Sequence, residues 1–158
     1  MKKTLLIILL AATFSLAQKP DDKAAALAVV NQLFAEMSAA NPPGIIDLHT
    51  GADSQLAAIR KTREGKMRLD MINRDAFSKF FTDKTVQTKE TMYDPKVEVS
   101  GDWAMVWGRY VFWVNGKVSH CGIDQFNLVR TEAGWKIANG ASTVDPGACT
   151  DKEKAMKP

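Results

Sequence analysis

The sequence lacks the residue patterns that metal, nucleotide and serine-hydrolase chemistry require. It holds two histidines, His49 and His120, far apart and without cysteine or carboxylate at ligand spacing, so we predict no metal site. No serine stands in a nucleophile-elbow sequence, and there is no glycine-rich phosphate loop. No motif therefore supports a hydrolase or a nucleotide-binding function, and no cofactor is predicted. His49 follows Asp47 in a polar loop and is expected at the surface.

Clusters of basic residues are also absent. No run rich in lysine and arginine with interleaved aromatic residues occurs anywhere in the chain. Such a run is the electrostatic signature of a nucleic-acid-binding surface, so we expect no nucleic-acid partner.

The one long apolar run stands at the beginning of the chain. Lys2 and Lys3 precede the apolar stretch 5–12, and Ser15-Leu16-Ala17 places small residues three and one before a cut. A membrane span would need roughly 20 apolar residues, more than this stretch provides. The pattern predicts a signal peptide over 1–17, a periplasmic or secreted protein, and no stable membrane anchor after cleavage. Loss of the two lysines lowers the net charge from +3 to +1.

Cysteine is scarce, but the number is even. Cys121 and Cys149 both follow the predicted signal peptide, and an oxidising compartment favours their pairing. We predict one disulfide, which would stabilise the fold by about 3 kcal/mol in the chain-entropy account. The alternative is two unrelated thiols, with Cys121 buried as a small apolar residue.

The first half of the chain predicts helices around one uncertain hairpin. Apolar residues at helical spacing, Leu27, Val30, Phe34 and Met37, predict an amphipathic helix that Asn41-Pro42-Pro43-Gly44 ends. The segments 55–62 and 66–72 read as a hairpin, although Leu-Ala-Ala-Ile at 56–59 is equally compatible with a helix. A second helix is predicted over 74–82, with Asn73 as its cap and phenylalanines on its buried face.

The second half predicts a meander of strands. Alternating patterns cover 85–99, 103–114, 117–130 and 135–144, and Asp94-Pro95 marks a bend or bulge in the first of these. Asn115-Gly116 is the strongest hairpin signal, because both central residues of a type I′ turn need positive φ. The last residues, 147–158, carry mixed charge and are expected to form a solvated tail.

The Asn115-Gly116 turn also predicts a register. It places Val114 opposite Lys117 and, with regular pairing, Arg109 opposite Gly122. One face then carries Trp103, Met105, Trp107, Arg109, Val111, Trp113, His120, Asp124, Phe126 and Leu128. The other carries Val106, Tyr110, Phe112, Cys121, Ile123, Val129 and Ile137. Because both faces are apolar, either the sheet curls around one face while helices or a second subunit cover the other, or a bulge switches the side-chain parity.

One ordered run of motifs in this half resembles a known family. Tyr-Val-Phe-Trp-Val-Asn-Gly-Lys at 110–117 is followed by Ser-His-Cys-Gly at 119–122, Phe-Asn-Leu-Val-Arg-Thr at 126–131 and Gly-Trp-Lys-Ile at 134–137. The run resembles the nuclear transport factor 2-like superfamily, and more closely its exported bacterial SnoaL-like proteins. The resemblance implies an α+β, cystatin-like cone: a curved antiparallel sheet wrapped around a long N-terminal helix, with a pocket at the wide end and frequent homodimers. The expected domain covers 18–146.

The polar residues on the predicted His120 face are the candidates for chemistry. His120 and Asp124 lie on one strand and Arg109 on its neighbour, so a histidine acid or base beside a guanidinium that holds a carboxylate is possible. Mutual structural pairing of these polar groups is the plainer interpretation. Glu90 is the best further acid. The tryptophans Trp103, Trp107 and Trp113 are expected to be core or dimer contacts.

Two functions from different classes remain open. The first is a ligand-binding domain whose pocket holds a small apolar molecule. The second is a cofactor-independent lyase or isomerase that uses His120 with Asp124 or Glu90 as acid and base. The predicted pocket residues are Trp107, Arg109, His120, Asp124 and Phe126. Convergence of His120, Asp124 and Glu90 on one point would separate the two functions.

Overall fold

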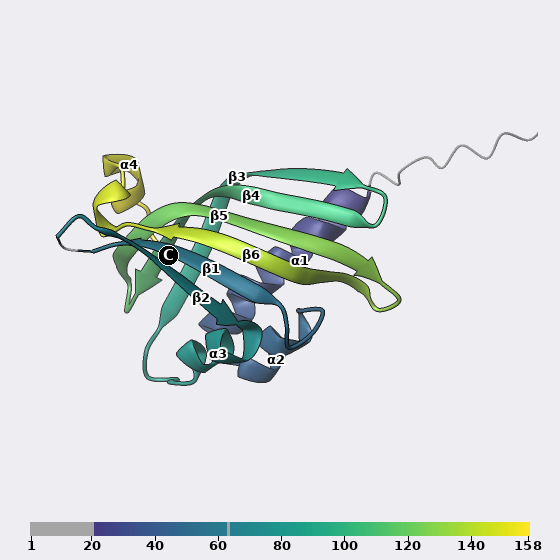
Figure 1. Cartoon of the computed structure of the whole chain (residues 1–158). Coiled ribbons are helices and arrows are strands. Elements are labelled where there is room, and N and C mark those ends of the chain that lie inside the picture. Colours follow the sequence, from purple (N-terminus) through teal and green to yellow (C-terminus); the bar gives the residue numbers. More distant parts are fainter. Residues whose placement is uncertain (1–20, 63) are drawn as a thin grey trace, which may run out of the picture.

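A six-stranded curved sheet packs one face against a long helix (Figure 1). The computed structural model describes residues 21–62 and 64–158, and the predicted signal peptide lies outside them. The strands are β1 (Gln55–Lys61), β2 (Met67–Asn73), β3 (Thr88–Ser100), β4 (Trp103–Val114), β5 (Lys117–Thr131) and β6 (Gly134–Val144). The helices are α1 (Asp21–Ser38), α2 (Pro42–Asp47), α3 (Arg74–Ser78) and α4 (Asp151–Lys154), with short 3-10 turns at Lys79–Phe81 and Pro146–Ala148. This is the predicted α+β, cystatin-like architecture.

The strand order is β2-β1-β6-β5-β4-β3. Neighbours pair in antiparallel fashion except β1 and β6, which run parallel. The segment 55–61 is therefore a strand and not a helix. Asn115 and Gly116 both have positive φ, as the predicted tight turn requires. The Asp94-Pro95 signal corresponds to a bulge between Tyr93 and Lys96.

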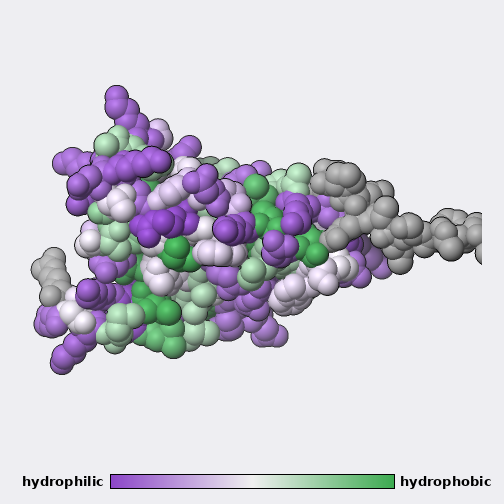
Figure 2. Space-filling view, turned by 90° about the horizontal axis from the view of Figure 1, so that it is seen from above, coloured by the Kyte–Doolittle hydropathy of each residue, from purple (hydrophilic) through white to green (hydrophobic). Residues whose placement is uncertain are grey.

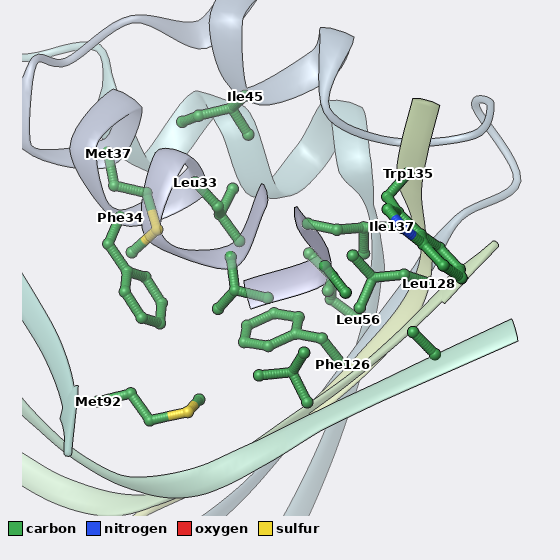
Figure 3. Packing of buried hydrophobic residues seen from close by; sticks show 14 of the residues in the cluster. Leu33, Phe34, Met37, Ile45, Leu56, Met92, Phe126, Leu128, Trp135 and Ile137 are labelled. Atoms are coloured by element: carbon green, nitrogen blue, oxygen red, sulfur yellow. The ribbon is translucent and has the colours of Figure 1, made fainter. Parts of the chain in front are cut away.

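The main core lies between α1 and the inner face of the sheet. Val30, Leu33, Phe34 and Met37 on α1 are buried at the predicted helical spacing. Figure 3 shows Phe34 on the α1 side of the core and Phe126 on the sheet side, with Met37 next to Phe34. The rings of Phe34 and Phe126 meet edge to face with centroids 6.1 Å apart. Helix α1 thus forms one wall of the cone, and the sheet forms the other.

A β-bulge overturns part of the predicted register. Val114 faces Lys117 as expected, but His120 pairs with Phe112 and Cys121 with Val111, because Ser119 is an extra residue in β5. Arg109 therefore faces Ile123 instead of Gly122. Every β5 side chain beyond the bulge changes face relative to the predicted pairing with β4. His120, Asp124 and Phe126 share the inner face with Tyr110 and Phe112, while Trp107 and Arg109 lie on the outer face.

The C-terminal residues pack on the outer face and do not form the solvated tail that the sequence predicts. The disulfide between Cys121 and Cys149 is present and ties this segment to β5. Thr150 and Glu153 form a capping box at the start of α4. Glu153 is 1% exposed and accepts hydrogen bonds from Arg109 at 2.7 and 3.0 Å, and another from the hydroxyl of Tyr93. A buried ion pair and a disulfide together hold the segment.

The three tryptophans of the β4 face lie on the outer side of the sheet. Trp113 is buried in a small cluster with the disulfide, Lys96 lies over the ring of Trp107, and Trp103 is exposed. Apolar residues also gather near the tip of the β1–β2 hairpin, seen as green atoms at the lower left of Figure 2. Met67, Leu69 and Met71 alternate along β2 and have exposed side chains. A homodimer could bury this apolar surface. Dimerisation stays a prediction.

Candidate functional site

A cavity of about 310 Å³ opens between α1, the inner face of the sheet and the segment that follows β2. Its walls are largely apolar, and polar side chains enter it from β1, β3, β4, β5 and β6. The lining residues are Leu33, Phe34, Met37, Leu56, Ala57, Ala58, Arg60, Ile72, Phe77, Phe80, Phe81, Thr88, Glu90, Tyr110, Phe112, His120, Asp124, Phe126, Ser142 and Val144. An apolar cavity with a few converging polar groups is the usual form of a small-molecule site.

Two buried carboxyl groups, Glu90 and Asp124, meet in this cavity. Burial, the charge of Asp124 and the hydrogen bond between the two groups hold the pKa of Glu90 well above its ordinary value. Burial also raises the pKa of Asp124, and hydrogen bonds with Glu90 and Ser142 partly offset that rise. Two ionised carboxylates cannot donate hydrogen bonds to each other, so the pair holds one proton, carried by Glu90 and directed at Asp124. Among the described residues, Oδ2 of Asp124 is buried and has no hydrogen-bond partner, which adds to the cost of ionising this group.

Tyr110 is a neighbour of this pair on the inner face. Burial, followed by the nearby charges of Asp124 and Glu90, raises the pKa of Tyr110, so its hydroxyl stays protonated. The hydroxyl donates to the carbonyl oxygen of Thr143 at 2.8 Å. Gly122 permits the close approach of that segment, because a Cβ there would lie 1.8 Å from the same oxygen. The pairing of Tyr110 with Gly122 thus helps to fix the back of the cavity.

His120 provides a neutral imidazole at the cavity wall. Burial, with a smaller effect from the positive charge of Arg60, lowers the pKa of His120 to about 4. Its ring stacks on Phe112 with centroids 4.9 Å apart and meets Tyr110 edge-on at 5.7 Å. Nδ1 lies 3.2 Å from the hydroxyl of Ser119, the bulge residue. The neutral ring can therefore accept or donate one proton at pH 7.

The structure separates the residues that the sequence predicted for the site. His120, Asp124, Phe126 and Glu90 all line the cavity, whereas Trp107 and Arg109 do not. The β5 bulge is the reason, since regular pairing would have kept Arg109 on the His120 face. Arg109 instead pairs with Glu153 beneath the C-terminal segment.

Sequence reasoning missed Arg60, the guanidinium that does line the cavity. The alternation of Leu56, Ala58 and Arg60 along β1 was the available signal. It could not be used while the segment was equally compatible with a helix. Tyr110 was missed as a site residue because the predicted register put it on the face opposite His120.

The surface position expected for His49 is wrong. The side chain is 4% exposed, and its Nδ1 lies 2.8 Å from the carbonyl oxygen of Ile45. Burial lowers the pKa of His49, and the residue is remote from His120 because it bridges to Ile137 at the other end of the sheet. In residues 21–62 and 64–158 no group of three histidine, cysteine or carboxylate side chains could hold a metal ion. Within the same residues, no helix combines the length and apolar character of a membrane span.

The fold is shared with solved structures of low sequence identity. It is similar to a nuclear transport factor 2-like protein with a cystatin-like fold from Novosphingobium aromaticivorans, with 12% identity, a TM-score of 0.63, and coverage of 86% of this chain and 90% of that chain. It is also similar to a candidate dehydratase of the nuclear transport factor 2-like family from Streptomyces avermitilis, with 14% identity, a TM-score of 0.61, and coverage of 78% and 96%.

A candidate aromatic ring hydroxylase from Novosphingobium aromaticivorans is comparably similar, with 16% identity, a TM-score of 0.61, and coverage of 78% of this chain and 89% of that chain. No family model matches the sequence, and no curated protein matches it. The fold is therefore the cystatin-like fold that these nuclear transport factor 2-like proteins share, as the resemblance of the sequence motifs implies. At this level of identity the similarity concerns the fold alone.

The depressed pKa of His120 predicts a pH dependence of stability. The folded state binds the His120 proton at about pH 4 and the unfolded state at about 6.5, so the unfolded state holds more protons between these values. Acidification from pH 6.5 to 4 should therefore remove stability through His120. We expect wild type to lose about 1–2 kcal/mol relative to His120→Gln over this range, a value reduced for the partial exposure of the ring.

Urea unfolding at several pH values measures this difference. Taking the difference between the two proteins removes the opposite contribution of Glu90, whose raised pKa favours the folded state at low pH, and the separate contribution of His49. A difference in the free energy of unfolding that does not change between pH 6.5 and 4 would contradict the assignment of a neutral His120.

Proposed function

We propose that this chain binds a small, mainly apolar molecule in the cone pocket and acts in the periplasm or outside the cell. The observation that carries the proposal is the carboxyl pair of Glu90 and Asp124, buried in a cavity with apolar walls. Burying two carboxyl groups that share one proton is costly, and an apolar pair of similar size would pack the same space without that cost. Such a pair has a use where it meets a polar group of a ligand.

The dimensions of the cavity set the size of that ligand. A volume of about 310 Å³ is at the small end of ligand sites and suits a molecule with one or two rings. Phe34, Phe80 and Phe126 offer ring faces and edges to such a molecule. The oxygens of the carboxyl pair can accept a hydrogen bond from one polar group of the ligand, and the neutral His120 can accept or donate one.

Two features of the sequence support a role outside the cytosol. The predicted signal peptide and the disulfide between Cys121 and Cys149 point to the same oxidising compartment. The disulfide joins β5 immediately after His120, so an oxidising environment also holds one wall of the pocket in place.

A bulky side chain in the pocket should weaken binding. Ala58 lines the cavity from β1, and Ala58→Phe should reduce the affinity for 2-naphthol, a neutral two-ring probe, by about ten-fold or more because the new ring occupies its space. Isothermal titration calorimetry measures the affinity.

The matched control is Ile59→Phe, which places a ring at the adjacent residue on the opposite face of the strand. That variant should bind 2-naphthol as wild type does. Absence of 2-naphthol binding by wild type, or equal binding by Ala58→Phe, would reject the pocket as the binding site.

A second candidate function is a cofactor-independent lyase or isomerase. The observation that favours it is the convergence of His120, Asp124 and Glu90 on one cavity. The neutral His120 can take a proton from a carbon atom next to a carbonyl group. Glu90 can turn its proton from Asp124 to the carbonyl oxygen as that oxygen gains negative charge. The proton then returns to another carbon in an isomerisation, or leaves with a hydroxyl group in a dehydration. The candidate dehydratase among the solved neighbours has chemistry of the second kind.

Proton exchange tests this second function without knowledge of the substrate. We expect wild type to accelerate the exchange of the α hydrogens of 1-indanone for deuterium in D₂O, followed by proton NMR. His120→Gln should abolish the acceleration, and Glu90→Gln should reduce it about 100-fold, since general acid–base groups contribute roughly 10²–10⁴-fold. Exchange by wild type at the rate of buffer alone would leave binding as the function.

A further inference from the structure

Two arginines and one carboxylate meet on the inner face of the β1–β2 hairpin. Nε of Arg60 donates to Oδ2 of Asp70 at 3.0 Å, and Nε of Arg68 donates to Oδ1 of the same group at 2.6 Å. Arg60 and Arg68 are directly opposed in the two strands. One carboxylate thus serves two guanidinium groups, so the cluster carries a net charge of +1 where β1 borders the cavity.

Arg60 is the member of this cluster that reaches the pocket. It follows Leu56 and Ala58 along the same face of β1, and all three line the cavity. Its side chain is 45% exposed. Among the residues that the structure describes, its hydrogen-bond partner is Asp70, reached through Nε, which leaves the two terminal nitrogens with donors to spare.

The positive charge of Arg60 shifts the pKa values of groups that line the cavity. Burial is the main cause of the lowered pKa of His120, and the positive charge of Arg60 lowers it further. Arg60 also opposes the rise in the pKa of Tyr110 that burial and the neighbouring carboxyls cause. Two polar groups of the cavity wall therefore lie within its field, although it is partly exposed.

The polar groups of the cavity wall differ in charge and in exposure. Glu90 and Asp124 are 9% and 2% exposed and together hold one negative charge, so an anion beside them is disfavoured. Arg60 is more exposed and belongs to the cluster with a net charge of +1. The rings of Phe34, Phe80 and Phe126 line the same cavity.

We propose that the pocket selects small organic monoanions, with a carboxylate held by the partly exposed Arg60 and an apolar body packed against the aromatic walls of the cavity. This inference rests on the proposed binding function and names its ligand class. The planar guanidinium of Arg60 suits a carboxylate because its donors match the two oxygens. Arg60 thus takes the anion-holding role that the sequence pattern suggested for Arg109.

A pair of isosteric probes tests the charge preference. 2-Naphthoate and 2-naphthamide have the same shape, and only the first is charged. By calorimetry at neutral pH, wild type should bind 2-naphthoate about ten-fold more tightly than 2-naphthamide, in keeping with a charge-assisted contact. Arg60→Gln should weaken binding of 2-naphthoate to the level of 2-naphthamide and leave 2-naphthamide almost unchanged.

The matched control is Lys61→Gln, which removes one positive charge from the neighbouring residue on the other face of β1. It should keep the preference for 2-naphthoate. Equal binding of both probes by wild type, or a preference that survives in Arg60→Gln, would overturn the role of Arg60 while the binding function stands. Failure of both probes and of 2-naphthol to bind would reject the binding function itself.

Discussion

The site depends on one extra residue in β5. Ser119 has no partner in β4, and this bulge shifts the pairing so that His120, Asp124 and Phe126 face α1. Regular pairing would place them with Trp107 and Arg109, and the cavity would lose its histidine and one carboxyl group. The bulge is held on both sides: the Ser119 hydroxyl lies 3.2 Å from His120, and Cys121 is bonded to Cys149. The disulfide therefore does more than pin the chain end, because it fixes the strand where its side chains change face.

Both faces of the sheet bury acidic side chains, but the two faces stabilise these groups differently. On the outer face, buried Glu153 has a full set of partners in Arg109, Tyr93 and the backbone of Thr150, so its charge is satisfied within the protein. On the inner face, no cation of the described residues shifts the pKa of Glu90 or Asp124, and the two groups retain a shared proton. A satisfied ion pair is a structural element. A carboxyl pair without a protein cation keeps hydrogen-bond acceptor positions that a ligand in the cavity can use.

The sequence predicted the architecture better than the site. Helical spacing identified α1, and the turn at Asn115 and Gly116 fixed the start of the β4–β5 pairing, because these signals are local. The bulge leaves no such local signal, so face assignment failed beyond it and Arg109 was placed in the pocket. Glu90 and Asp124 were found as residue types, but their meeting depends on sheet curvature over three strands. Arg60 was missed because the pattern at 55–61 did not distinguish strand from helix. The prediction of a solvated tail was wrong because nothing in this charged segment distinguishes Glu153, which is buried, from its exposed neighbours.

The central claim is that Glu90 and Asp124 share one proton inside the pocket at neutral pH. Isotope-edited infrared spectroscopy tests it directly, since a protonated carboxyl group has a carbonyl stretch distinct from that of a carboxylate. With ¹³C-labelled glutamate, wild type at pH 7 should show a protonated-carboxyl band that is absent from Glu90→Gln. A wild-type spectrum at pH 7 that contains carboxylate bands alone would contradict the claim.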